Sequence, residues 1–145
     1  MIEYRPLTAA DGEGLRRLRL ALWPDDTGDA FRAALADGLG GERSVHYGAF
    51  DDGELVGFVE ASVRDWGDGC ETAPVAWIEG IYVEERLRRT GVGRALVECV
   101  AGWARDRGLR ELGSDALTGN APSLRAHARW GFAETERVVM LRRRL

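Results

Sequence analysis

The segment Arg88-Arg89-Thr90-Gly91-Val92-Gly93-Arg94 combines two glycines with three arginines. It lies between an apolar run, residues 76–83, and a long helical pattern that starts at Gly91. Glycines permit a tight turn whose backbone N–H groups converge on one point, and the start of the following helix adds partial positive charge. Such a turn, with arginines beside it, suits a pyrophosphate group. The alternative is an ordinary glycine-rich helix start beneath solvated arginines.

Two common phosphate-binding sequences are absent from the chain. It contains no G-x-x-x-x-G-K-[ST] segment, and Gly91-Val92-Gly93 lacks the third glycine of the dinucleotide fingerprint. A nucleoside triphosphatase and an NAD-dependent enzyme are therefore disfavoured.

Apolar periodicity predicts the elements that position this turn. Strands are predicted at residues 2–5, 45–50, 55–63, 76–83, 109–114 and 135–142, with a hairpin turn at Asp51-Asp52-Gly53. Helical spacing predicts two helices before residue 41, one over 91–107 and one over 121–130. The order indicates an α/β (α+β) fold: one domain, residues 1–145, with a mixed central sheet of about six to seven strands and about four helices.

The composition narrows the class of protein. With 45% hydrophobic and 30% charged residues, the chain has the balance of a globular domain, and no apolar stretch is long enough for a membrane span. Because no signal-peptide pattern is present, we expect a cytoplasmic protein with no membrane partner. Cys70 and Cys99 have neither paired spacing nor neighbouring histidines, so we expect free thiols and no metal site.

Charge is distributed unevenly along the chain. The net charge of −4 conceals three arginines against thirteen acids in residues 24–79, and thirteen arginines against eight acids in residues 80–145. This asymmetry favours a protein that attracts a cation on one side and an anion on the other, although an uneven solvated surface is an equal alternative. The acidic balance and the lack of an interleaved aromatic platform argue against a nucleic-acid partner.

Several segments together resemble a known family. The turn Arg88-x-x-Gly91-x-Gly93 follows the run Ile81-Tyr82-Val83, and Asn120 and Gly131-Phe132 come downstream, as in the acetyl-CoA-binding core of the GNAT acetyltransferase superfamily. The resemblance implies that acetyl-CoA is the cofactor, with its pyrophosphate on the turn and its pantetheine arm along the strand and Asn120. The residues implied in CoA binding are Ile81, Tyr82, Val83, Arg88, Arg89, Thr90, Gly91, Val92, Gly93, Arg94 and Asn120.

A closer resemblance extends over most of the chain. Leu22-Trp23-Pro24, residues 60–64 and 78–83, Ser114-Asp115 and residues 131–138 coincide in order with the aminoglycoside 6'-N-acetyltransferases. The loop Trp66-Gly67-Asp68-Gly69 departs from the Tyr-Val-Asn-Gly that is common in that family. Since this loop is expected to border the acceptor, the departure bears on the substrate range.

Two carboxylates are candidates for proton transfer from an amine acceptor. An amine with a pKa of ~10 is protonated at neutral pH, and a carboxylate beside it attracts the cation and can accept its proton. Glu79, in an apolar strand predicted to be buried, and Asp115, at the end of the fifth strand, are these candidates. Alternatively, Glu79 pairs with a buried arginine and Asp115 caps a turn.

A histidine and two tryptophans complete the predicted site. His127 lies four residues before Gly131, where many GNAT enzymes place a tyrosine that protonates the leaving thiolate; a surface histidine is the alternative. Trp23 and Trp66 flank acidic loops and suit sugar rings that carry ammonium groups. The predicted catalytic residues are Glu79, Asp115 and His127, and the predicted substrate-binding residues are Trp23, Asp25, Trp66, Glu79, Asp115 and Glu136.

The sequence thus predicts an acetyl-CoA-dependent N-acetyltransferase that acts on the 6'-amine of aminoglycosides by direct transfer in a ternary complex. The alternatives are a GNAT enzyme for another polyamine or peptide amine, and a non-catalytic acyl-CoA sensor, against which the presence of Glu79 and Asp115 argues. Because members of the family are often dimers and the arginine-rich strand predicted at Arg137–Arg144 can cross to a partner, we expect a homodimer.

Overall fold

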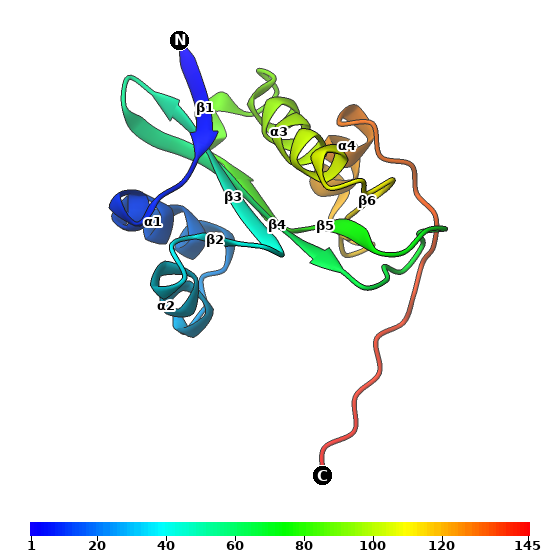
Figure 1. Cartoon of the computed structure of the whole chain (residues 1–145). Helices are drawn as coiled ribbons and strands as arrows, with labels where there is room; N and C mark the ends of the chain where they lie inside the picture. The colour runs from blue at the N-terminus through cyan, green and yellow to red at the C-terminus, as the bar shows by residue number, and fades with distance from the viewer.

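A six-stranded sheet separates two pairs of helices in the computed structural model, which describes all 145 residues (Figure 1). The strand order is β1-β3-β4-β5-β6, and the short β2 pairs with β3. Neighbouring strands are antiparallel except for β5 and β6, which are parallel. The strands are β1 (Ile2–Pro6), β2 (Gly40–Gly41), β3 (Ser44–Asp51), β4 (Glu54–Arg64), β5 (Val75–Val83) and β6 (Leu112–Gly113).

The helices form one layer on each face of the sheet. The helices α1 (Gly12–Leu22) and α2 (Asp29–Ala36) lie on one side, and α3 (Val92–Asp106) and α4 (Ala121–Arg129) lie on the other (Figure 1). Two 3-10 turns, Ala9–Asp11 and Glu85–Leu87, precede α1 and α3. None of the helices combines the length and apolar composition that a bilayer crossing demands.

Each helical layer has its own apolar core. On the α3 side, Leu96, Val97 and Val100 of α3 pack with Val59 and Ile78 of the sheet. The second cluster joins α1 and α2 to the opposite face, with these buried members: Leu7, Leu15, Leu18, Phe31, Leu39, Phe50, Leu55 and Phe58. The two faces of the sheet are therefore packed by two separate apolar clusters.

A buried polar cluster lies within the α1 side. Glu60 of β4 accepts a hydrogen bond from Arg19 of α1, and its carboxylate also lies 3.0 Å from Nε2 of His46. The other nitrogen of His46 lies 3.0 Å from the carbonyl oxygen of Leu39. This cluster fastens α1 and the segment after α2 to the sheet, which fixes the position of the loop that follows α1.

The mixed α/β fold, the four helices and the β3–β4 hairpin agree with the sequence prediction. Cys70 and Cys99 are free thiols, as expected. The strand predicted at residues 135–142 is wrong, because the chain after residue 132 forms neither helix nor strand and extends away from the sheet (Figure 1). An alternating apolar pattern forms a strand only where the segment pairs with another strand, and this segment pairs with none of the strands of the sheet.

Candidate active site

The strands β5 and β6 part shortly after they meet. They pair only at Ala76 with Leu112 and at Trp77 with Gly113, whereas the pairing of β5 with β4 continues to Val83. One edge of β5 therefore has no strand partner beyond Trp77. We call the gap between residues 78–83 of β5 and the chain that continues from Ser114 after β6 the fork.

The backbone groups on the free edge of β5 can be assigned from the ladder with β4. The Glu84 N–H donates to the Val56 carbonyl at 2.9 Å, which places Glu84 in a hydrogen-bonded pair. Because such pairs alternate along an antiparallel ladder, the N–H and C=O groups of Tyr82 point toward β4 and those of Ile81 and Val83 point into the fork. An extended ligand with amide groups can pair with this edge as an added strand does.

The turn before α3 has the geometry of an anion cradle. Gly91 caps α3 with a φ of 98°, in the left-handed region that glycine adopts without strain, and Arg89 has a φ of 61°. The first N–H groups of α3 have no partner within the helix, and the helix dipole adds positive charge there. A Cβ atom on Gly91 would meet nothing within 4 Å, so the space over the turn is open. The turn thus fits a pyrophosphate group.

The arginines of this turn have different surroundings. Arg88 donates from Nε to the Val83 carbonyl at 2.9 Å, and its guanidinium lies 5.3 Å from the centre of the Tyr82 ring. Arg94 donates to the carbonyl of Arg129, which ties α3 to the end of α4. Two of the three predicted phosphate-binding arginines therefore also hold the fork and α4 in place.

Gly93 has a packing role that the sequence does not indicate. A Cβ atom at this position would lie 2.7 Å from the Trp130 ring. The close approach of α4 to the start of α3 therefore requires glycine here. The prediction placed Gly93 in the anion-binding turn, and it lies there, but its lack of a side chain serves the contact between the helices.

Glu79 lies at a β-bulge in the β4–β5 ladder. Glu60 pairs with Gly80 and Ala61 pairs with Ile78, so Glu79 is the extra residue between them. The bulge resets the alternation of side chains along β5. Ile78 points into the α3-side core, whereas Glu79 lies on the opposite face with the side chains of β4.

The expectation that Glu79 is buried is therefore wrong. About a third of its side chain, 33%, is exposed. Its carboxylate accepts hydrogen bonds from Arg64 Nε at 2.9 Å, from a terminal nitrogen of Arg64 at 2.7 Å and from Ser62 Oγ at 2.6 Å. Burial raises the pKa of the Glu79 carboxyl, but the hydrogen bonds from Arg64 and Ser62 outweigh it, so the pKa lies below its ordinary value. Glu79 is thus a carboxylate at neutral pH.

Arg64 is the centre of a cluster of acids that sequence reasoning missed. Its guanidinium pairs with Glu79 and lies 4.5 Å from the centre of the Trp77 ring. Glu79, and more distantly Asp115 and Asp68, raise the pKa of Arg64. Of the two predicted acids, Glu79 pairs directly with Arg64, whereas Asp115 forms no ion pair with it and acts on its pKa only through its charge. The only signal in the sequence was the alternative that Glu79 has an arginine partner.

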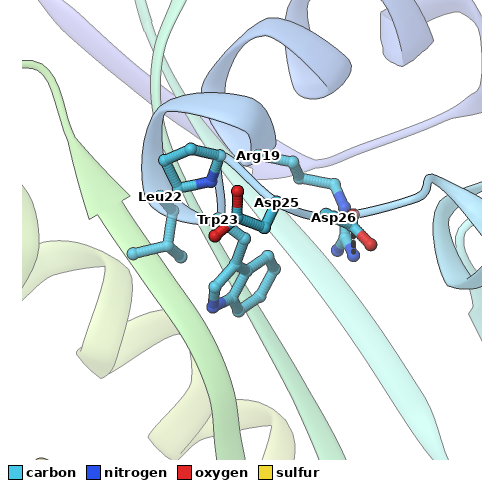
Figure 2. A pocket seen from close by; sticks show the side chains of 6 residues that line it. Arg19, Leu22, Trp23, Asp25 and Asp26 are labelled. Carbon is cyan, nitrogen blue, oxygen red and sulfur yellow. Dashed lines mark ion pairs between the residues drawn. The ribbon is translucent and has the colours of Figure 1, made fainter.

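A pocket of about 480 Å³ lies at the end of α1 (Figure 2). Figure 2 shows the Trp23 indole pointing from the end of α1 toward the sheet, and Asp26 paired with Arg19. The ring of Trp23 packs against Gly80, the neighbour of Glu79 in β5. This contact brings the pocket next to Glu79. Its lining consists of Arg19, Leu22, Trp23, Pro24, Asp25 and Asp26.

His127 lies on α4, close to the base of the fork. Its Nε2 is 2.8 Å from Oγ of Ser114, the residue that follows β6, and its Nδ1 is 2.8 Å from the carbonyl oxygen of Ser123. Asn120 caps α4, because its side-chain oxygen accepts a hydrogen bond from the Ser123 N–H at 3.3 Å. Ser114 was absent from the predicted site, although it directly precedes the predicted Asp115.

Trp66 and Glu136 neither line the pocket at the end of α1 nor pair with Glu79 or Arg64. The side chain of Trp66 is 65% exposed on the loop after β4. Glu136 is exposed in the extended C-terminal segment. Their assignment to the acceptor site stays a prediction.

Comparisons with known proteins identify the family of this chain. Residues 12–132 match the acetyltransferase (GNAT) family. The chain belongs to the GNAT acetyltransferase family.

Relatives that align with nearly the whole chain have a more specific name. The "Aminoglycoside N(6')-acetyltransferase type 1" of Stenotrophomonas maltophilia is 43% identical over 95% of this chain and 90% of its own length. The protein of the same name from Serratia marcescens is 45% identical over 88% of this chain and 89% of its own length.

A solved structure shows the same arrangement of elements. AAC(6')-Iy in complex with the bisubstrate analogue CoA-S-monomethyl-acetylneamine is 35% identical to this GNAT protein, with a TM-score of 0.93 over 100% of this chain and 99% of that one. AAC(6')-Ih from Acinetobacter baumannii, at 31% identity, gives a TM-score of 0.91 over 100% and 99% of the two chains.

Replacement of Arg64 tests the electrostatics of the acid cluster. Arg64→Met removes the positive charge and both guanidinium hydrogen bonds to Glu79. Because these interactions lower the pKa of Glu79 and burial raises it, the pKa rises in the variant. A pH titration of the Glu79 side-chain carbon by NMR measures the change. Arg43→Met is the control, because Arg43 pairs with the exposed Asp65 and leaves the pKa of Glu79 unchanged. An unchanged Glu79 pKa in Arg64→Met contradicts the assignment.

Proposed function

We propose that this GNAT protein transfers the acetyl group of acetyl-CoA to the 6'-amine of aminoglycosides by direct transfer in a ternary complex. The observation that carries the proposal is the position of Glu79 at the base of the fork, in a chain that matches aminoglycoside N(6')-acetyltransferases over nearly its whole length. The structure has a separate region for each of the two substrates. The edge of β5 and the turn before α3 bind acetyl-CoA, and the acidic region beside them binds the amine acceptor.

The cofactor half is built mainly from backbone. The N–H groups at the start of α3 bind the pyrophosphate, and the free edge at Ile81 and Val83 pairs with the amides of the pantetheine arm. Asn120, exposed at the start of α4, contacts the same arm. Bound acetyl-CoA supplies the thioester whose acetyl group is transferred. A backbone N–H near Val83, on the same edge of β5, donates to the thioester oxygen that becomes negative as the amine attacks.

The acceptor half is built from carboxylates and an aromatic ring. Glu79 and Asp115 attract the ammonium group, and Asp25 and Trp23 contact the sugar rings in the pocket at the end of α1. Trp66 and Glu136 complete the rim on the outer side. Because the hydrogen bonds from Arg64 and Ser62 hold the pKa of Glu79 below its ordinary value, Glu79 is ionised and accepts the amine's proton directly or through water.

The binding of a polycation must compete with Arg64. This guanidinium already neutralises Glu79 in the free protein. An ammonium group that approaches Glu79 therefore exchanges one cation for another, and the geometry favours an acceptor with several ammonium groups. A monoamine gains no further contacts with Asp115 and Asp25 and binds more weakly. We further propose that the reaction takes place in the cytoplasm, a reducing compartment in which free Cys70 and Cys99 persist.

Thiol release measures the proposed reaction. Acetyl-CoA with kanamycin or tobramycin yields free CoA thiol, whereas an aminoglycoside with a hydroxyl in place of the 6'-amine yields none. Glu79→Gln lowers kcat/KM by ~10²-fold or more, because it removes the proton acceptor and an attracting charge. Asp115→Asn lowers it as well through the lost charge.

Glu54→Gln is the matched control for the acid substitutions. Glu54 is 68% exposed in its side chain and forms only a long ion pair with Arg17, so its loss leaves turnover unchanged. The absence of thiol release with every 6'-amino aminoglycoside eliminates the proposed function. Wild-type turnover in Glu79→Gln removes Glu79 from the mechanism while the function stands.

We also propose that two copies of the chain form a homodimer. Four consecutive apolar residues of the C-terminal segment, Val138, Val139, Met140 and Leu141, are between 61% and 90% exposed, which is unusual for a run of this kind. The segment has no strand partner in its own chain, and its two valines favour a strand. Pairing with a second copy covers its side chains and satisfies its backbone.

Light scattering coupled to size exclusion tests the dimer. The intact chain elutes with twice its 16.0 kDa mass. A chain truncated after Glu134 elutes as a monomer because it lacks the apolar run. An intact chain that is monomeric at micromolar concentration, or a truncated chain that is still dimeric, contradicts the proposal.

A further inference from the structure

Ser114 occupies the base of the fork. The last paired position of β6 is Gly113, which lies opposite Trp77, and Ser114 is the next residue along the chain. On the other arm, Ile78 and then Glu79 follow Trp77. The hydroxyl of Ser114 and the carboxylate of Glu79 are therefore both carried by residues that start the two arms, one on each side of the place where the strands part.

The His127 ring is held with one defined nitrogen toward Ser114. Its Nδ1 lies 2.8 Å from the Ser123 carbonyl oxygen, which can only accept a hydrogen bond, so Nδ1 carries a hydrogen. The ring centres of Trp130 and Phe132 lie 5.1 Å and 5.3 Å from that of His127 and confine the ring from two sides. Nε2 is thus the nitrogen that can exchange a proton, and Ser114 Oγ lies 2.8 Å from it.

This arrangement changes the role predicted for His127. The hydroxyl of Ser114 lies against the exchangeable nitrogen, so His127 reaches the fork through Ser114. We infer that Ser114 is the catalytic residue that protonates the leaving thiolate, with His127 behind it as the proton source. The inference rests on the proposed acetyl transfer and adds to it the identity of the group that completes it.

In this step, one proton moves from Ser114 to the sulfur and another moves from His127 to Ser114. The carbon–sulfur bond breaks and its electron pair goes to sulfur, which takes the hydrogen of the Ser114 hydroxyl. The Nε2 hydrogen of the His127 imidazolium passes to Ser114 Oγ at the same time. His127 becomes neutral and keeps its Nδ1 hydrogen on the Ser123 carbonyl. It regains a proton from solvent before the next turnover, while the proton taken from the amine by Glu79 leaves to solvent.

The charged residues around His127 do not touch it. Asp115 follows Ser114 on the strand side, Arg129 lies on α4, and Arg94 of α3 donates to the Arg129 carbonyl. None of the three forms a hydrogen bond or an ion pair with the imidazole, whose polar contacts are all to Ser114 and Ser123. The protonation of His127 is therefore linked directly to the hydroxyl that it contacts.

Steady-state kinetics of three variants test the inference. In Ser114→Ala and in His127→Gln, kcat for kanamycin acetylation falls by ~10²-fold, while the KM for acetyl-CoA is little changed. The double variant also loses ~10²-fold rather than ~10⁴-fold, because both residues act in one relay.

Ser114→Thr is the matched control, because it keeps a hydroxyl at the same position. It retains most of kcat, and thermal melting of every variant establishes that each is folded. Wild-type kcat in folded Ser114→Ala, multiplicative losses in the double variant, or a Ser114→Thr that behaves as Ser114→Ala overturns the inference. Each of these outcomes leaves wild-type acetylation intact, whereas an inactive wild type defeats the proposed function itself.

Discussion

The site depends on the early parting of β5 from β6. Had the two strands continued in parallel beyond Trp77 and Gly113, the backbone groups of Ile81 and Val83 would be consumed by the sheet. Unpaired strand edges are normally covered or blunted, because exposed N–H and C=O groups invite pairing with other chains. Here the free edge supports an extended ligand that carries amides. The same parting sets Ser114 and Glu79 at the starts of the two arms.

The sheet also places the anion cradle and the carboxylates of the acceptor region on different faces. The anion cradle belongs to α3, on one face, whereas Glu79, Asp25 and Asp26 belong to the face covered by α1 and α2. The bulge at Glu79 makes this division possible, because it turns a carboxylate away from the α3-side core that receives Ile78. In the proposed reaction, a diphosphate and a polycation therefore approach from different sides and meet where the sheet lacks a strand.

The sequence was informative where a local pattern has one physical solution. The glycine turn before α3 and the β3–β4 hairpin were predicted because their residues demand particular backbone angles. The burial of Glu79 was predicted wrongly, since a bulge depends on the register of two strands and leaves no mark on either. Arg64 and Ser114 were missed because their partners, Glu79 and His127, are 15 and 13 residues away in the chain. The strand predicted at residues 135–142 failed because an apolar alternation does not say which strand the segment would pair with, and here it pairs with none.

Hydrogen exchange at β5 tests whether the free edge of this strand holds the cofactor. If the free edge of β5 binds CoA, the N–H groups of Ile81 and Val83 exchange rapidly in the free protein and become protected when CoA is added. The N–H of Tyr82, which points to β4, is protected in both states. Unchanged exchange at Ile81 and Val83 in a protein saturated with CoA would contradict the account.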